Sequence, residues 1–160
     1  MSFPQLRDCK PHVDDKELDE VEALLGIILP HDLRSHFLKY NGGKPKPEYF
    51  QVDDDFYMVR GFFSVKYGIA GDPDLTFEKS YQRLSNHIPE GLIPFADDAA
   101  GNLFCYSVNK ESMHNIFFWE HEFYDDDDQG LRKLAPNLHV FLNGFAQDPD
   151  VEDEDDDDED

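Results

Sequence analysis

"IPFADDAAGNLFCYSV", residues 93–108, places a short apolar segment on each side of an Asp-Asp pair, two alanines and Gly-Asn. Each flanking segment is rich in aromatic or branched residues and has the length of one strand. In the second segment Phe104, Tyr106 and Val108 alternate with smaller residues, which is the period of a strand. The stretch therefore predicts two antiparallel strands joined by a structured loop.

The Asp97-Asp98 pair in this loop allows three interpretations: a cation site, an acid–base site or a turn. A Mg²⁺ or Ca²⁺ site needs further oxygen ligands at defined spacing, and the pair does not fit the EF-hand pattern. Adjacent strand residues point to opposite faces, which suits shared acid–base chemistry poorly. We favour a turn in which Asp97 or Asn102 accepts backbone N–H groups, Gly101 takes a positive φ, and Asp98 remains free to face a partner.

Outward from this stretch, the pattern predicts a third short strand over residues 115–120 and a closing helix over residues 134–145. On the N-terminal side, residues 14–25 form an amphipathic helix that ends at Gly26. "LPHDLRSHFLKYNGG", residues 29–43, predicts a second helix, with Asn41, Gly42 and Gly43 supplying the left-handed residue that stops it.

Between these regions, residues 49–52 and 56–65 are predicted strands, and the triplet Asp53, Asp54 and Asp55 is their hairpin turn. Residues 44–48 are a predicted loop and residues 75–84 a middle helix. The order of elements indicates an α+β fold with one sheet covered by helices on one face. We expect one domain over residues 1–147, followed by an acidic tail over residues 148–160.

The chain is strongly acidic, with 36 Asp and Glu against 14 Lys and Arg. The tail holds eleven of these acids and no base, so the preceding residues still carry a net charge of −11. A field of this sign repels nucleic acid and anionic membranes and favours encounter with basic proteins or cations. We therefore expect no nucleic-acid or membrane partner. Three roles for the tail stay open: a solvated solubility aid, a docking arm, or weak cation binding.

No sequence motif points to catalysis. Cys9 and Cys105 fit no CxxC or zinc spacing, and GxSxG, P-loop, GxGxxG and HExxH motifs do not occur. We expect two reduced thiols in a cytoplasmic protein, with no catalytic residue, metal or cofactor, and neither a signal peptide nor a membrane span.

Four segments together resemble a known family: "LPHDLRSHFLKYNGG", "LIPFADDAAGNLFCYSV", "NIFFWEHE" and "LAPNLHVFLNGF". In order and spacing they are similar to the SUKH superfamily, in its Smi/Knr cell-wall-regulator-like branch, over residues 18–145. The resemblance implies an α+β domain with N-terminal helices, a mixed, mostly antiparallel sheet of about six strands, a middle helix and a C-terminal helix.

The resemblance also implies a function in protein binding. Most bacterial members are regarded as immunity proteins that neutralise a polymorphic toxin, often a nuclease, delivered between competing cells. Eukaryotic members regulate cell-wall synthesis through protein partners, and neither group is known for catalysis. We therefore expect an immunity protein against a basic nuclease toxin. The alternative is a non-catalytic regulator or scaffold that binds another basic protein.

The expected contact residues are acids on loops and two residues near the third strand, because exposed charge meets a basic partner first. They are Asp53, Asp54, Asp55, Asp98, Trp119, Glu120, Asp125, Asp126, Asp127 and Asp128. The residues expected to shape the fold at the two glycine motifs are Asn41, Gly42, Gly43, Asp97, Gly101 and Asn102.

Overall fold

The strand-loop-strand at residues 92–107 lies inside a five-stranded antiparallel sheet. The computed structural model describes residues 3–68, 71–123 and 130–147. Every residue of the two strands over 92–97 and 103–107 is buried, so both faces of the sheet are covered here. The predicted strand-loop-strand is confirmed. The spatial order is β5 (Gly61–Phe62), β6 (Leu92–Asp97), β7 (Leu103–Ser107), β8 (Ile116–Trp119) and β9 (Leu131–Ala135).

The other described strands form two smaller antiparallel sheets. One contains β10 (Phe145–Ala146), β3 (Tyr49–Val52) and β4 (Asp55–Met58), and the other pairs β1 (Gln5–Arg7) with β2 (Lys44–Lys46). The α+β class is confirmed, but the main sheet has five strands rather than about six, and every registered pair between described strands is antiparallel.

The expected strand over residues 56–65 is divided between two ladders. Val59 N donates to Glu48 O, which lies just before β3, whereas Arg60 N donates to Asp97 O at the end of β6. The chain therefore changes sheets between neighbouring residues, and β4 ends before β5 begins. Residues 44–48, expected as a loop, contribute β2 in the same way through pairing with a distant strand.

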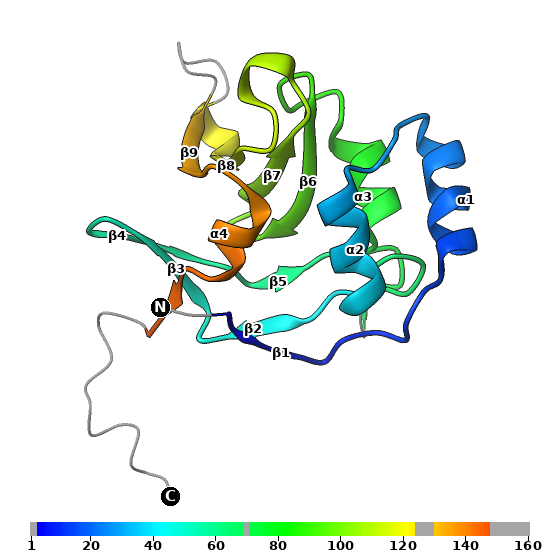
Figure 1. Cartoon of the computed structure of the whole chain (residues 1–160), viewed down its shortest axis with the longest axis horizontal. Coiled ribbons are helices and arrows are strands. Elements are labelled where there is room, and N and C mark those ends of the chain that lie inside the picture. The colour runs from blue at the N-terminus through cyan, green and yellow to red at the C-terminus, as the bar shows by residue number, and fades with distance from the viewer. Residues whose placement is uncertain (1–2, 69–70, 124–129, 148–160) are drawn as a thin grey trace, which may run out of the picture.

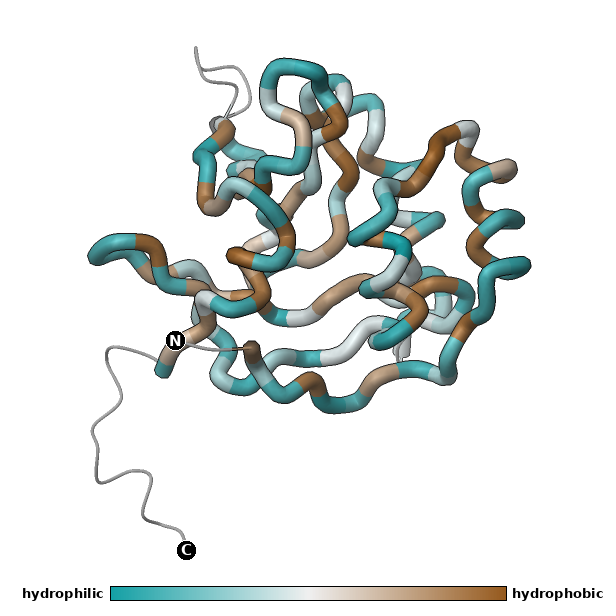
Figure 2. The backbone as a smooth tube through the Cα atoms, in the orientation of Figure 1, coloured by the Kyte–Doolittle hydropathy of each residue, from teal (hydrophilic) through white to brown (hydrophobic). Residues whose placement is uncertain are grey.

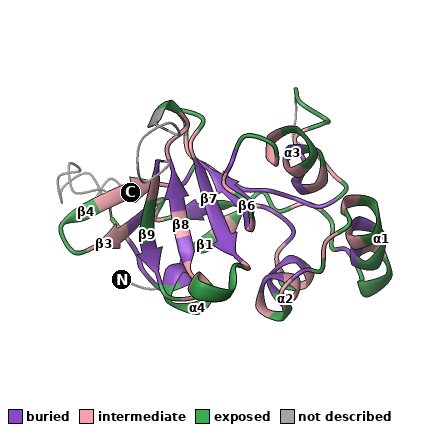
Figure 3. Ribbon diagram, turned by 90° about the horizontal axis from the view of Figure 1, so that it is seen from above, coloured by how far each residue is buried: buried purple, intermediate pink, exposed green. Residues whose placement is uncertain are grey.

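The helices are α1 (Asp15–Leu25), α2 (His31–Lys39), α3 (Phe77–Leu84) and α4 (Leu138–Leu142), with short 3₁₀ turns at Lys110–Ser112 and His121–Phe123. The first three lie together beyond β6, and α4 lies near β8 and β9 (Figures 1 and 3). The helix α1 ends as predicted at Gly26, which takes a left-handed φ of 70°. None of the helices in these ranges is long and apolar enough to cross a membrane.

An aromatic core joins the ladders. The Phe141 ring of α4 lies 4.6 Å from Phe50 of β3, 5.7 Å from Phe95 of β6 and 5.8 Å from Phe104 of β7, between centroids. The closing helix is shorter than predicted, because residues 134–145 also supply the end of β9 and the start of β10. The four residues expected to face inward are nevertheless buried: Leu138, Phe141, Leu142 and Phe145.

Candidate functional site: an acidic hairpin surface

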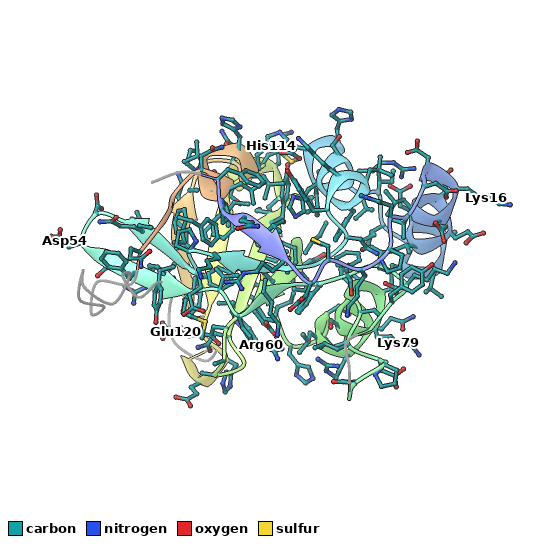
Figure 4. The ribbon with its side chains drawn as sticks, turned by 90° about the horizontal axis from the view of Figure 1, so that it is seen from below. Lys16, Asp54, Arg60, Lys79, His114 and Glu120 are labelled. Atoms are coloured by element: carbon teal, nitrogen blue, oxygen red, sulfur yellow. The ribbon has the colours of Figure 1, made fainter. Side chains whose placement is uncertain are left out.

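The hairpin of β3 and β4 projects from the molecule on the side opposite α1 (Figure 1). Val52 faces Asp55 across the ladder, so Asp53 and Asp54 form the predicted turn, and Asp55, expected as part of it, is the first residue of β4. Asp53 takes a left-handed φ of 54°, and its carbonyl accepts a bond from Gln51 Nε2 at 3.2 Å. The tip is hydrophilic (Figure 2), and Asp54 points away from the body of the molecule (Figure 4).

The charge of this turn is not compensated by the part of the chain that the structure describes. Asp53, Asp54 and Asp55 are exposed, and none makes an ion pair with a described residue. The acids of α1 differ, because Arg34 contacts Asp15, Asp19 and Glu22, and Lys66 contacts Glu17 at 2.7 Å. The hairpin therefore offers free negative charge, whereas much of the charge on α1 is already paired.

The base of the hairpin adds an aromatic side chain to this charge. Tyr57 of β4 is half-buried, and its ring centroid lies 5.0 Å from that of Phe118 on β8. Partial burial raises the pKa of Tyr57, with nearby Arg132 acting in the opposite direction. Arg132 Nη2 also lies 3.8 Å from Glu120 Oε1. We define the hairpin face as Asp53, Asp54, Asp55, Tyr57 and Glu120.

One of the expected contact residues does not belong to this face. Trp119 is only 3% exposed, and its Nε1 has no hydrogen-bond partner among the described atoms, so it presents no surface to a partner. Tyr57 is a half-buried aromatic residue that was not among the expected contacts, and its position directly after the acidic turn was the sequence signal that could have found it. Asp125, Asp126, Asp127 and Asp128 lie outside the described residues, and their contact role stays a prediction.

Asp98, rather than Asp97, shapes the loop between β6 and β7. Asp98 Oδ1 accepts bonds from the N–H groups of Ala100 and Asn102, both at 2.9 Å, and Oδ2 accepts one from Asn102 Nδ2 at 3.0 Å. The expectation of a free Asp98 is therefore corrected, since both of its oxygens already accept hydrogen bonds. Gly101 has the expected positive φ, at 90°. Asn102 Oδ1 in turn accepts from His121 N at 3.1 Å, which fixes the loop to the chain after β8.

Asp97 is buried and is held by Arg60. Arg60 Nε lies 3.1 Å from Asp97 Oδ1, and Nη2 contacts Oδ2. Burial raises the pKa of the Asp97 carboxyl, and the bonds from Arg60 oppose that shift. This carboxylate is therefore part of the structure and is not available to a partner.

The Asn-Gly-Gly motif also has a structural role. Asn41 is fully buried, donates through Nδ2 to Pro11 O and Val65 O, and accepts from Val65 N at 2.6 Å. The helix α2 ends earlier than expected, because Tyr40 is already extended (φ −136°). Gly42 and Gly43 then take φ values of 82° and 113° beyond the helix. They admit close packing rather than stopping the helix.

Neither cysteine is arranged as a nucleophile. Partial burial and neighbouring Asp8 raise the pKa of Cys9, and burial raises that of Cys105, so both favour the thiol over the reactive thiolate. Cys9 borders a pocket of about 390 Å³ that Arg60 and Asp97 also line. Within the described ranges, no group of three or more His, Cys, Asp or Glu side chains could hold a metal.

The two glycine motifs and the strand-loop-strand lie inside a match to a known family, which spans residues 12–144. The chain belongs to the SMI1 / KNR4 family (SUKH-1). This confirms the resemblance found in the sequence, and the SUKH-1 match ends before the acidic tail begins. The chain is also 26% identical over 162 residues to the SPbeta prophage-derived uncharacterized protein YokK of Bacillus subtilis (strain 168). That alignment covers 89% of this chain and 80% of YokK.

Proposed function

We propose that this protein is an immunity protein that binds and neutralises a cognate toxin, with a basic nuclease as the target. Family membership supports a role in protein binding, since bacterial SUKH proteins are regarded as immunity proteins without catalysis. The observation that carries the proposal is the hairpin face. It contains three exposed carboxylates, none of which makes an ion pair with a described base. It also contains a half-exposed tyrosine, Tyr57.

A nuclease surface suits this face because it must be positive to bind the phosphate backbone. Complementary charge can steer association to about 10⁸–10⁹ M⁻¹s⁻¹ at low salt. Charge alone does not give slow dissociation, which needs buried aromatic or Arg anchors within an interface of about 1,600 Å². Tyr57 supplies such an anchor next to the acids, so both requirements meet on one face.

The decisive experiment is coexpression with the toxin encoded beside this gene, with cell growth and complex formation as the two measurements. The wild-type chain should rescue growth and bind the purified toxin. The variant Asp53→Asn/Asp54→Asn/Asp55→Asn should bind more slowly, and Tyr57→Ala should dissociate faster. Failure of the wild-type chain both to rescue growth and to bind would contradict the proposal.

A matched control distinguishes the effect of the hairpin acids from the effect of lowering the net charge of the whole protein. Glu20, Asp72 and Asp74 are also exposed, and none makes an ion pair with a described residue. The variant Glu20→Gln/Asp72→Asn/Asp74→Asn therefore removes the same charge from other places. If this control slows association as much as the hairpin variant does, the hairpin face is not the binding surface. Binding of a basic protein that is not a toxin would instead favour a regulator or scaffold.

A further inference from the structure

The ribbon of β1 and β2 exposes a basic face on an otherwise acidic protein. In its register Arg7 faces Lys44 and Gln5 faces Lys46, and all four side chains are exposed. Leu6 and Pro45 form the intervening pair. Leu6 packs against the core, and Pro45 is buried. Because side chains alternate across a strand, the three bases share one face. Figure 4 views the molecule from the side on which β1 lies in front.

This basic ribbon lacks counter-charges among the described residues. Arg7, Lys44 and Lys46 make no ion pair with any of them. Like charges directly opposite each other across a ladder are destabilising, so the Arg7–Lys44 pair carries an electrostatic cost. An anion bound on this face would remove that cost.

A pocket of about 420 Å³ lies beside the ribbon. It is lined by the three bases, by Tyr49 and by Gln147, and also by Asp8 and Glu48, which are not within ion-pair distance of the bases. Gln147 is there because Ala146 pairs with Tyr49 at the start of β3. The next thirteen residues of the chain, 148–160, contain eleven acids. The polyacidic segment therefore directly follows a residue, Gln147, that lines this pocket.

We propose that residues 148–160 bind in cis to the basic ribbon. Thirteen residues span up to about 45 Å when extended, which is enough to cross a three-residue ribbon. Tethering at Gln147 gives the tail an effective concentration on the order of mM, so weak contacts suffice for occupancy. The bound tail neutralises the ribbon. Because the tail's carboxylates are then occupied, the ribbon competes with any basic partner for them. This inference does not rest on the proposed toxin.

Paramagnetic relaxation in the full-length chain tests the proposal. A nitroxide is attached at Asp156→Cys in a Cys9→Ser background, since Cys9 is exposed and Cys105 is buried. At low salt, the backbone amide signals of residues 5–8 and of Lys44, Lys46 and Glu48 should lose intensity relative to the reduced, diamagnetic sample. About 1 M NaCl, where the screening length is about 3 Å, should restore them.

Two charge variants make the test specific. Arg7→Gln/Lys44→Gln/Lys46→Gln should abolish the intensity loss. Lys79→Gln/Arg83→Gln/Lys110→Gln removes three exposed bases elsewhere and should leave it intact. An absence of ribbon broadening in the wild-type chain at low salt would overturn the proposal without any variant. Broadening that is stronger at another surface, or that persists in the ribbon variant, would overturn it equally.

Discussion

The Arg60 guanidinium spans both oxygens of the Asp97 carboxylate, and the Arg60 N–H also donates to Asp97 O at 2.8 Å. The contact fixes the start of β5 to the end of β6, directly before the Asp98 loop. The Asp97 side chain is 12% exposed and that of Arg60 is 43% exposed, so the carboxylate depends on the arginine more than the arginine depends on it.

Arg60→Ala should lower the free energy of unfolding at pH 7 by about 1–3 kcal/mol, because it leaves a buried carboxylate without its charged donor. The pKa of Asp97 is already raised above 3.8, and loss of Arg60 raises it further. A folded-state pKa above the unfolded value favours folding below the unfolded value and loses that contribution as the pH rises through the folded value. The deficit of the variant should therefore shrink toward pH 4, as urea unfolding at pH 7 and pH 4 would measure.

The double variant Arg60→Ala/Asp97→Asn is the control for this pair. Removing the charge from the carboxyl should recover part of the loss at pH 7 and cancel the extra pH dependence. The single variant Asp97→Asn completes the cycle. If the losses of Arg60→Ala and Asp97→Asn simply add in the double variant, the contact between Arg60 and Asp97 contributes no measurable stability.

His36 on α2 should make the protein acid-sensitive. Its side chain is buried near the rings of Tyr40 and Phe62, and burial lowers its pKa to about 4 from 6.5. The unfolded chain then binds more protons than the folded chain between these values, so stability is lost as the pH falls from about 6.5 to about 4. We expect about 2–3 kcal/mol from this residue. His36→Leu should flatten the pH profile of unfolding over that interval, and an unchanged profile would contradict the assignment.

Local patterns in the sequence predicted the helices, the strand-loop-strand and the acidic turn, because each depends on neighbours along the chain. The ribbon of β1 and β2 was not predictable, since it depends on pairing residues about forty positions apart. The division of residues 56–65 between ladders has the same cause. Local composition does not say where a strand changes partners.

The candidate site was predicted only in part. The Asp53–Asp55 turn was recognised, whereas the loop is shaped by Asp98 instead of Asp97, and Asp97 is paired with Arg60. A register shift between Pro94 and Ala96 lies just before them, and such a bulge changes which way the following side chains face. Trp119 was expected as a contact residue, but its burial depends on the strands paired with β8, which the sequence pattern does not reveal.

Gly42 should tolerate a methyl group much less than Gly26 does, although both have left-handed φ values. A Cβ on Gly42 would lie 2.9 Å from Ser64 Cβ, whereas a Cβ on Gly26 would meet nothing within 4 Å. Gly26→Ala should cost about 1–2 kcal/mol from the backbone alone. Gly42→Ala adds overpacking of about 1–3 kcal/mol. Thermal unfolding of the two variants compares them directly, and equal losses would show that the Gly42 site relaxes freely.

Asp98 provides the last test, because it separates a loop-forming role from a contact role. Asp98→Ala removes three accepted bonds and should lower the free energy of unfolding by about 1–3 kcal/mol. Asp98→Asn keeps Oδ1 for the two backbone N–H groups but sets its own Nδ2 donor against Asn102 Nδ2 in place of the third bond, so it should cost about 1 kcal/mol, which is less than Asp98→Ala. Because Asn removes the charge with little change to the loop, Asp98→Asn should leave partner association unchanged. A slower association rate for this variant, at unchanged stability, would return Asp98 to the binding surface.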